Sequence, residues 1–108
     1  HPVAHSFPTR RSSDLVSVAN SGEEGIELVR EVRPDAVLMD VVMPGMNGFQ
    51  ATRTLNKDGE TSDIPVIIVT TKDQQTDRIW GMRQGAKEYL VKPVKEADLM
   101  AVLKTVLG

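Results

Sequence analysis

Short apolar runs alternate with amphipathic segments along residues 16–107. The runs are rich in β-branched residues and predict strands, while the segments between them repeat apolar residues every three or four positions and predict helices. The predicted strands are residues 16–19, 36–39, 65–70 and 88–91, and the predicted helices are about 21–33, 48–56, 73–84 and 96–107. Apolar strands separated by helices indicate a parallel sheet covered on both faces.

Local signals set the expected ends of these elements. Ser21 and Glu24 form a capping-box pattern at the start of the first helix, and Pro34 ends that helix. Gly85 is the expected C-terminal cap of the third helix. Because the run at 66–69 is the most apolar of the four, we expect it to be the most buried segment.

Three polar side chains follow or close three of the predicted strands. Asp40, Thr70 and Lys92 would lie together, because the carboxyl ends of parallel strands share one edge of the sheet, where ligands bind. Each has a plainer interpretation. Asp40 is also a common turn or capping type, Lys92 suits a solvated loop, and Thr71 leaves the register of Thr70 open by one. The convergence of carboxylate, hydroxyl and ammonium favours a functional site.

Composition excludes several classes of protein. The chain has 108 residues, 40% of them apolar and 26% charged, and a net charge of −2, which gives no reason to expect nucleic acid or an anionic membrane as partner. It contains no cysteine, so disulfides and thiol chemistry are absent. No apolar run is long enough for a transmembrane helix or a signal peptide, and we expect a cytoplasmic protein without membrane insertion.

Three stretches carry a family resemblance: LMDVVMPGMNG at 38–48, PVIIVTT at 65–71 and YLVKP at 89–93. Together they resemble the receiver domain of bacterial response regulators, the CheY-like fold. Within that family the sequence resembles single-domain regulators of type IV pilus twitching motility (PilH-like), especially over residues 46–93. The resemblance implies an α/β fold, a three-layer doubly wound parallel sheet of the flavodoxin-like kind with strand order 2-1-3-4-5, here lacking the first βα unit.

The same resemblance implies a function in a two-component phosphorelay. Asp40 would accept a phosphoryl group from a histidine kinase, Thr70 would hydrogen-bond a phosphoryl oxygen, and Lys92 would pair with the phosphate. Phosphoryl transfer depends on positioning and on neutralising charge, so an acceptor carboxylate needs cations beside it. The domain would signal by contact with a downstream protein target rather than act as an enzyme.

Further roles follow from the resemblance alone. Asp40 and the backbone carbonyl of Val42 would bind Mg²⁺, an ion that prefers oxygen ligands. Tyr89 would be the aromatic switch residue, although plain packing explains a half-buried tyrosine equally well. Pro93 would follow a cis peptide bond. Trp80 marks either a partner surface or ordinary packing.

The first fifteen residues do not fit this family. His5–Leu15 resembles the translation of a sequencing-library adapter, so we expect residues 1–15 to be a non-native or disordered leader and residues 16–108 to be a truncated receiver domain. The remaining acidic Mg²⁺ ligands belong to the missing first strand, which predicts impaired phosphorylation. That strand would lie between 16–19 and 36–39, so its loss predicts open edges or rearranged pairing, with low stability and association.

Two other functions compete with this interpretation. A phosphohydrolase with an aspartate nucleophile also uses an acid at a strand end, but it needs a second Asp two positions later, and Val42 occupies that position. A nucleotide-binding module needs a Gly-rich phosphate loop directly after a strand, and the glycine pairs at 22–25 and 45–48 lie elsewhere.

Overall fold

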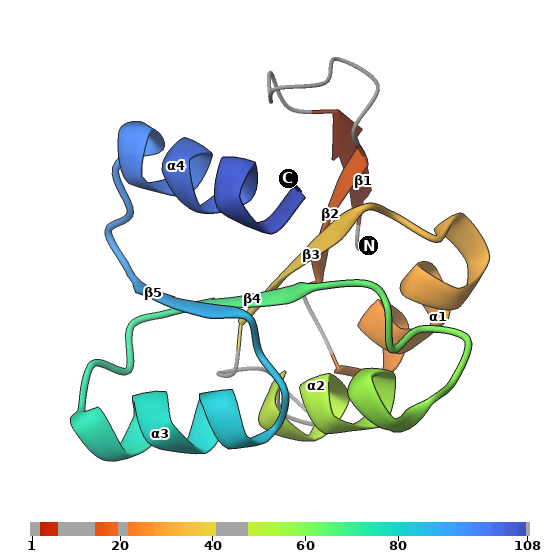
Figure 1. Ribbon diagram of the computed structural model, residues 1–108, viewed down its shortest axis with the longest axis horizontal. Helices are drawn as coiled ribbons and strands as arrows, with labels where there is room; N and C mark the ends of the chain where they lie inside the picture. The colour runs from red at the N-terminus through yellow and green to blue at the C-terminus, as the bar shows by residue number, and fades with distance from the viewer. Residues whose placement is uncertain (1–2, 7–14, 20–21, 41–47, 108) are drawn as a thin grey trace.

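The computed structural model describes residues 3–6, 15–19, 22–40 and 48–107 (Figure 1). The predicted strands and helices are confirmed to within two residues at each end. The strands are β1 (Val3–Ser6), β2 (Leu15–Ala19), β3 (Ala36–Met39), β4 (Val66–Thr70) and β5 (Glu88–Val91), and the helices are α1 (Gly22–Val32), α2 (Gly48–Lys57), α3 (Gln75–Arg83) and α4 (Glu96–Leu107).

Helix ends follow the local chemistry where the structure describes them. Gly85 follows α3 with a φ of 105°, a left-handed conformation that costs glycine least. Its amide donates to the carbonyl of Met82 and helps to close the helix. Ser21 and the side chain of Glu24 lie outside the described part of the structure, so the expected capping box stays a prediction.

The strands form one sheet in the order β1-β2-β3-β4-β5. β2, β3, β4 and β5 run parallel, while β1 pairs antiparallel with β2 at the edge. The α/β architecture predicted for the chain is therefore confirmed over its four parallel strands. Their carboxyl ends share one rim of the sheet, which brings Asp40, Thr70 and Lys92 within reach of one another.

The expectation that residues 1–15 are irregular is wrong for β1. Val3–Ser6 pairs with the strand that follows, with Val3 opposite Val18 and Ser6 opposite Leu15. An open sheet edge presents unpaired N–H and C=O groups, and a four-residue strand can satisfy them through its backbone alone. The composition of residues 1–15 could not exclude a short strand at the edge of the sheet.

β2 pairs directly with β3, with Val16 opposite Ala36 and Ala19 opposite Met39. Of the two expected results of a missing strand, the structure has the rearranged pairing. Direct pairing satisfies the inner backbone groups of β2 and β3, which a gap would leave exposed.

The helices divide unequally between the two faces of the sheet. α1, α2 and α3 lie on one face and α4 alone lies on the other (Figure 1). Because side chains alternate along a strand, Val37 and Met39 pack toward α1 and α2, whereas Ala36 and Leu38 pack toward α4.

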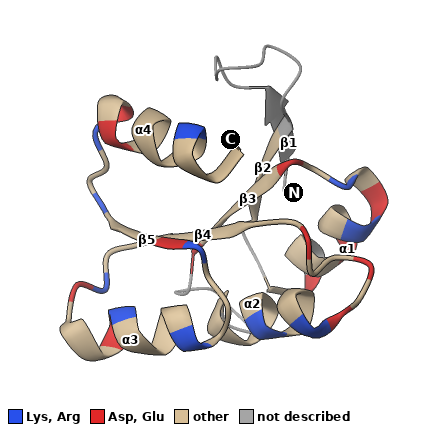
Figure 2. Ribbon diagram, viewed as in Figure 1, with Lys and Arg blue, Asp and Glu red and all other residues tan. Residues whose placement is uncertain are grey.

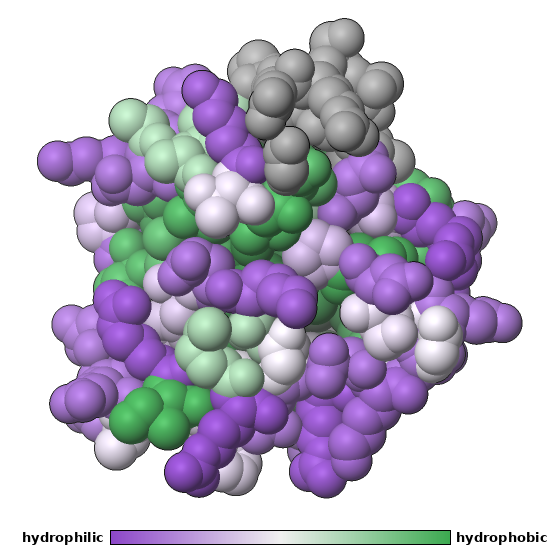
Figure 3. Space-filling view, in the orientation of Figure 1, coloured by the Kyte–Doolittle hydropathy of each residue, from purple (hydrophilic) through white to green (hydrophobic). Residues whose placement is uncertain are grey.

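β3, rather than the segment at 66–69, is the most buried strand, so that prediction is wrong. All four residues of β3 are buried, whereas Val69 in β4 is only half-buried. Val69 belongs to the α4 face and lines the cavity that borders Asp40 and Lys92, whereas Ile67 on the same face is fully buried. Figure 3 shows apolar surface between α4 and the sheet on the side in view.

Candidate functional site

An ion pair joins two of the predicted site residues across the rim of the sheet. Lys92 Nζ donates to Asp40 Oδ2 at 2.8 Å, although the two residues are 52 positions apart. Asp40 follows β3 and Lys92 follows β5, so β4 lies between the strands that carry them. The Asp40 side chain is 26% exposed and that of Lys92 46% exposed, so the pair is open to an incoming group.

Thr70 closes β4 between these two residues. It is fully buried, and the amide of Lys72 donates to its Oγ1 at 3.4 Å. The backbone carbonyl of Thr70 accepts from the amide of Lys92 at 2.8 Å, which fixes the end of β5 against the end of β4. Thr71 is exposed, so the two neighbouring threonines differ sharply in environment. The Lys92–Pro93 peptide bond is cis.

Tyr89 lies in β5 and faces α3. It is 3% exposed, and its hydroxyl donates to the backbone carbonyl of Lys72 at 2.8 Å. Burial raises the pKa of the Tyr89 phenol, and the negative charge of Asp77 raises that pKa further. The tyrosine therefore contacts the loop that begins at Thr70.

Val42, the predicted carbonyl ligand of Mg²⁺, lies outside the described residues. Among the residues that are described, no group of three or more His, Asp or Glu side chains is placed to hold a metal ion. Asp40 can supply one carboxylate, and its partner Lys92 is a cation. The described residues alone therefore do not fit a magnesium site.

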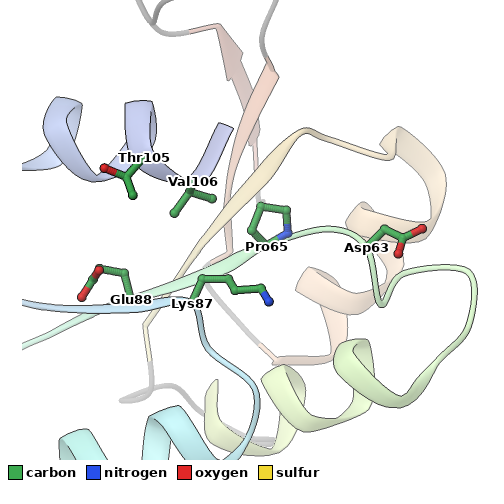
Figure 4. Close-up of a pocket in the computed structure, with 6 residues that line it drawn as sticks. All are labelled: Asp63, Pro65, Lys87, Glu88, Thr105 and Val106. Atoms are coloured by element: carbon green, nitrogen blue, oxygen red, sulfur yellow. The ribbon is translucent and has the colours of Figure 1, made fainter. Parts of the chain in front are cut away.

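Two cavities lie at opposite ends of the strands. A cavity of about 120 Å³ borders Asp40 and Lys92 and continues over Val18, Leu38 and Val69. A larger one, of about 340 Å³, lies beside the amino ends of β4 and β5 and the last turns of α4 (Figure 4). Because ligands in open α/β sheets bind at the carboxyl ends of strands, the smaller cavity belongs to the site and the larger one does not.

Sequence reasoning missed one contact near the site. The Arg78 guanidinium of α3 lies 5.4 Å from the centre of the Tyr89 ring, and Nη1 donates to the Tyr89 carbonyl at 3.4 Å. No spacing in the sequence predicts a contact between a helix and the strand after it. Trp80 is 51% exposed, so ordinary core packing does not account for it.

The rim can hold an anionic group beside a nucleophilic carboxylate. The Asp40 oxygens can attack an electrophile, and Lys92 supplies positive charge 2.8 Å away. Thr70 adds a hydroxyl at the neighbouring strand end. This set resembles what phosphoryl transfer needs, which is positioning and charge neutralisation rather than covalent chemistry by many groups.

Comparisons with known proteins agree with this arrangement. The model of the response regulator receiver domain family matches residues 7–104. Protein PilH of Pseudomonas aeruginosa is 63% identical over 90 residues, which are 83% of this chain and 74% of that protein. The transcriptional regulatory protein AfsQ1 of Streptomyces coelicolor is 38% identical over 90% of this chain but only 42% of its own length.

Solved structures agree as well. The receiver domain of the sensor histidine kinase PA1611 from Pseudomonas aeruginosa has a TM-score of 0.75 and 31% identity, over 83% of this chain and 74% of that one, and it holds a magnesium ion in its active-site cleft. A response regulator from Chloroflexus aurantiacus has a TM-score of 0.77 and 30% identity, over 82% and 73% of the two chains. Within the described part of this chain, no helix has the length and apolarity needed to cross a membrane.

Proposed function

Because this chain belongs to the response regulator receiver domain family, we propose that it accepts a phosphoryl group on Asp40 from a histidine kinase. Receiver domains are signalling modules, and this one would pass on its state by contact with a protein target. The 2.8 Å ion pair between Asp40 and Lys92 carries the proposal, since it places a cation beside the acceptor carboxylate.

In the proposed step an Asp40 oxygen attacks the phosphorus of a phosphohistidine. The new P–O bond forms as the P–N bond breaks, and the imidazole leaves with the electron pair of that bond. Lys92 then shifts its contact from the free carboxylate to the phosphoryl oxygens, and Thr70 offers its hydroxyl to one of them. The positive charge of Lys92 offsets the repulsion between the Asp40 carboxylate and the phosphoryl group. Such charge interactions are strongest where water is excluded.

Magnesium is expected in receiver domains, as in the PA1611 domain. The described residues of this chain do not complete a magnesium site. If further acids held the ion, it would supply a second positive charge beside Asp40. We propose that Asp40 and Val42 would be two of its ligands, and that further acids would come from a segment corresponding to the unmatched quarter of PilH. The chain as it stands would then be phosphorylated poorly.

Finer assignments rest on the relatives. The 63% identity to PilH favours control of twitching motility, with a histidine kinase and a downstream protein as partners in the cytoplasm. The domain division, with residues 1–15 as a foreign leader, stays a prediction. An aspartate-nucleophile phosphohydrolase is the alternative, and Val42 argues against it because that position would need a second acid.

Intact-mass measurement tests the acceptor. The chain from residue 16 would be preceded by the first strand and helix of a receiver domain, with their acidic pair, and incubated with Mg²⁺ and acetyl phosphate. We expect one phosphoryl adduct, at least tenfold more than on the unextended chain, because the added acids would hold the metal. Asp40→Asn should abolish the adduct, while Asp73→Asn, an exposed acid near the same rim, should leave it. A folded extended chain that stays unlabelled, or an adduct that survives Asp40→Asn, would exclude Asp40 as the acceptor.

A further inference from the structure

Tyr89 joins three parts of the molecule. Its backbone belongs to β5, its ring packs under α3, and its hydroxyl donates to the carbonyl of Lys72 in the loop after β4. The amide of the same Lys72 donates to Thr70 Oγ1. Any rotation that carries the ring out of the core would break the bond to Lys72, so the orientation of Tyr89 and the shape of the loop after Thr70 depend on each other.

Arg78 covers the outer side of this tyrosine. Its guanidinium lies 5.4 Å from the ring centre, within cation–π range, and the same group donates to the backbone carbonyl of Tyr89. The flat guanidinium can stack on a ring and donate at its edge, which an ammonium cannot do. Both contacts fall on one residue, so Arg78 holds the ring and the backbone of Tyr89 together.

Close packing brings α3 near enough for this contact. A Cβ at Gly81 would lie 2.9 Å from Ile68 Cδ1, closer than real Cβ atoms come, and 3.0 Å from Tyr89 Cδ2, which is a tight contact. Glycine therefore allows the helix to approach the ring. Arg78, one turn earlier in α3, then reaches across the ring from the exposed side.

We propose that Arg78 is a positioning residue that keeps Tyr89 buried with its hydroxyl on Lys72. Through Tyr89, this contact fixes the loop that follows Thr70. Its importance for signalling rests on the proposed function. Thr70 and Lys92 are themselves joined by a backbone hydrogen bond. Arg78 thereby links the exposed surface of α3 to the rim that carries Asp40.

The single tyrosine of the chain permits a direct test, because ultraviolet titration reports Tyr89 alone. Burial is the largest cause of its raised pKa, the charges of Asp77, Asp40 and Asp73 add to it, and Arg78 opposes them. If Arg78 acted only through its charge, Arg78→Met would raise the pKa of Tyr89 further. If Arg78 holds the ring in place, the ring is released to water and the pKa falls toward its ordinary value.

We expect the pKa of Tyr89 to fall in Arg78→Met and the Tyr89 ring signals in NMR to move toward those of a solvated tyrosine. A rise in the pKa, or an unchanged pKa, would overturn the proposal. Arg83→Met is the matched control, since it removes the other arginine of α3 and should leave the titration unchanged (Figure 2).

Arg78→Lys provides a second variant that keeps the charge. It should release the ring partly and lower the pKa by less than Arg78→Met does, whereas an unchanged pKa would contradict the role of the guanidinium. Circular dichroism would establish that each variant is folded. The titration needs no phosphoryl group, so its failure would leave Asp40 as acceptor untouched, and failed labelling of Asp40 would leave this result untouched.

Discussion

The two faces of the sheet are built from the same kinds of side chain but are covered to very different extents. On the face of α1, α2 and α3, strand residues such as Val37, Met39 and Ile68 are fully buried. On the face of α4, the cluster around Leu103 includes strand residues that are only partly buried, Val18, Val69 and Leu90. Val16, Ala36 and Ile67 on the α4 face are nevertheless fully buried, so the single helix covers only part of that face and leaves the rest accessible.

The rim that carries Asp40 and Lys92 lies where the two faces meet. Lys92 leads from β5 toward α4, while Tyr89 packs with Ile68 and Ala86 on the side of α3. The small cavity beside the ion pair continues onto the thinly covered α4 face, over Val18 and Val69. The site therefore has a firmly packed side that positions groups and an open side that gives access.

Matched leucines on the two faces should give the largest difference. Leu55 of α2 and Leu103 of α4 are almost fully buried, and Leu→Ala in a core costs about 3 to 5 kcal/mol, more where the cavity cannot collapse. We expect roughly 4 kcal/mol for Leu55→Ala, because neighbouring helices hold α2 in place, and roughly 3 kcal/mol for Leu103→Ala, because α4 can shift into the space.

Urea unfolding measures both losses, and hydrogen exchange identifies where each acts. Exchange in Leu103→Ala should rise mainly in α4, whereas Leu55→Ala should loosen α1 and α2 together. If both variants lost the same free energy of unfolding and showed the same exchange pattern, the two faces would respond alike. That result would contradict the difference proposed between the faces. Association through the open face, expected from the sequence, stays a prediction.

Much of this fold could be predicted from the chain, because periodicity is a local signal. The four parallel strands β2 to β5 and all four helices follow from apolar spacing, and the strand ends then bring Asp40, Thr70 and Lys92 to one rim. Pairing is different, since it depends on which strands meet. The strand at Val3–Ser6 and its antiparallel pairing with β2 could not be predicted from the composition of residues 1–15.

Two features of the site were also beyond the sequence. The contact of Arg78 with Tyr89 depends on the position of α3 over β5, which the close approach at Gly81 permits. The half-exposure of Val69 depends on what covers the sheet, and a run of apolar residues contains no information about that. In both, the missing information concerned how elements pack rather than which elements form.

Two adjacent residues of β2 point to opposite faces, so substitutions there allow a smaller-scale comparison of the two faces. Ser17 is fully buried on the side of α1, and its hydroxyl has no hydrogen-bond partner in the described part of the protein. Val18 next to it faces α4 and is half-buried. Ser17→Ala removes an unsatisfied buried hydroxyl and should stabilise the fold by about 1 kcal/mol.

The counterpart is Val18→Thr, which introduces a hydroxyl of similar shape on the open face. Water can reach a half-buried position, so the substitution should cost less than about 1 kcal/mol. Urea unfolding of both variants is sufficient to compare them. A destabilised Ser17→Ala would indicate that its hydroxyl has a partner after all, and a loss well above that figure for Val18→Thr would indicate a dry α4 face.

The smallest expected effect concerns the ion pair that fastens α1 to the turn after α2. Arg30 Nη2 lies 2.8 Å from Asp58 Oδ2, and the amide of Glu60 donates to Asp58 Oδ1. The Glu60 amide first, and the Arg30 side chain second, lower the pKa of Asp58 below its usual 3.8. A lowered pKa means that the stability from this carboxylate is present above pH 3.8 and is lost as the pH falls through the lower folded-state value.

Asp58→Asn should therefore melt at a slightly lower temperature than the parent at pH 7, and the two melting temperatures should converge only as the pH falls below 3.8. Both side chains are partly exposed, and salt weakens such a pair, so the gap should also narrow at high ionic strength. Asp63→Asn, which changes an exposed acid in the same connection, is the control that should leave the melting temperature at pH 7 unchanged. If the difference between the two melting temperatures persisted unchanged at pH 2, Asp58 would act through packing. The charge of Asp58 would then not contribute to the stability of the three-helix face.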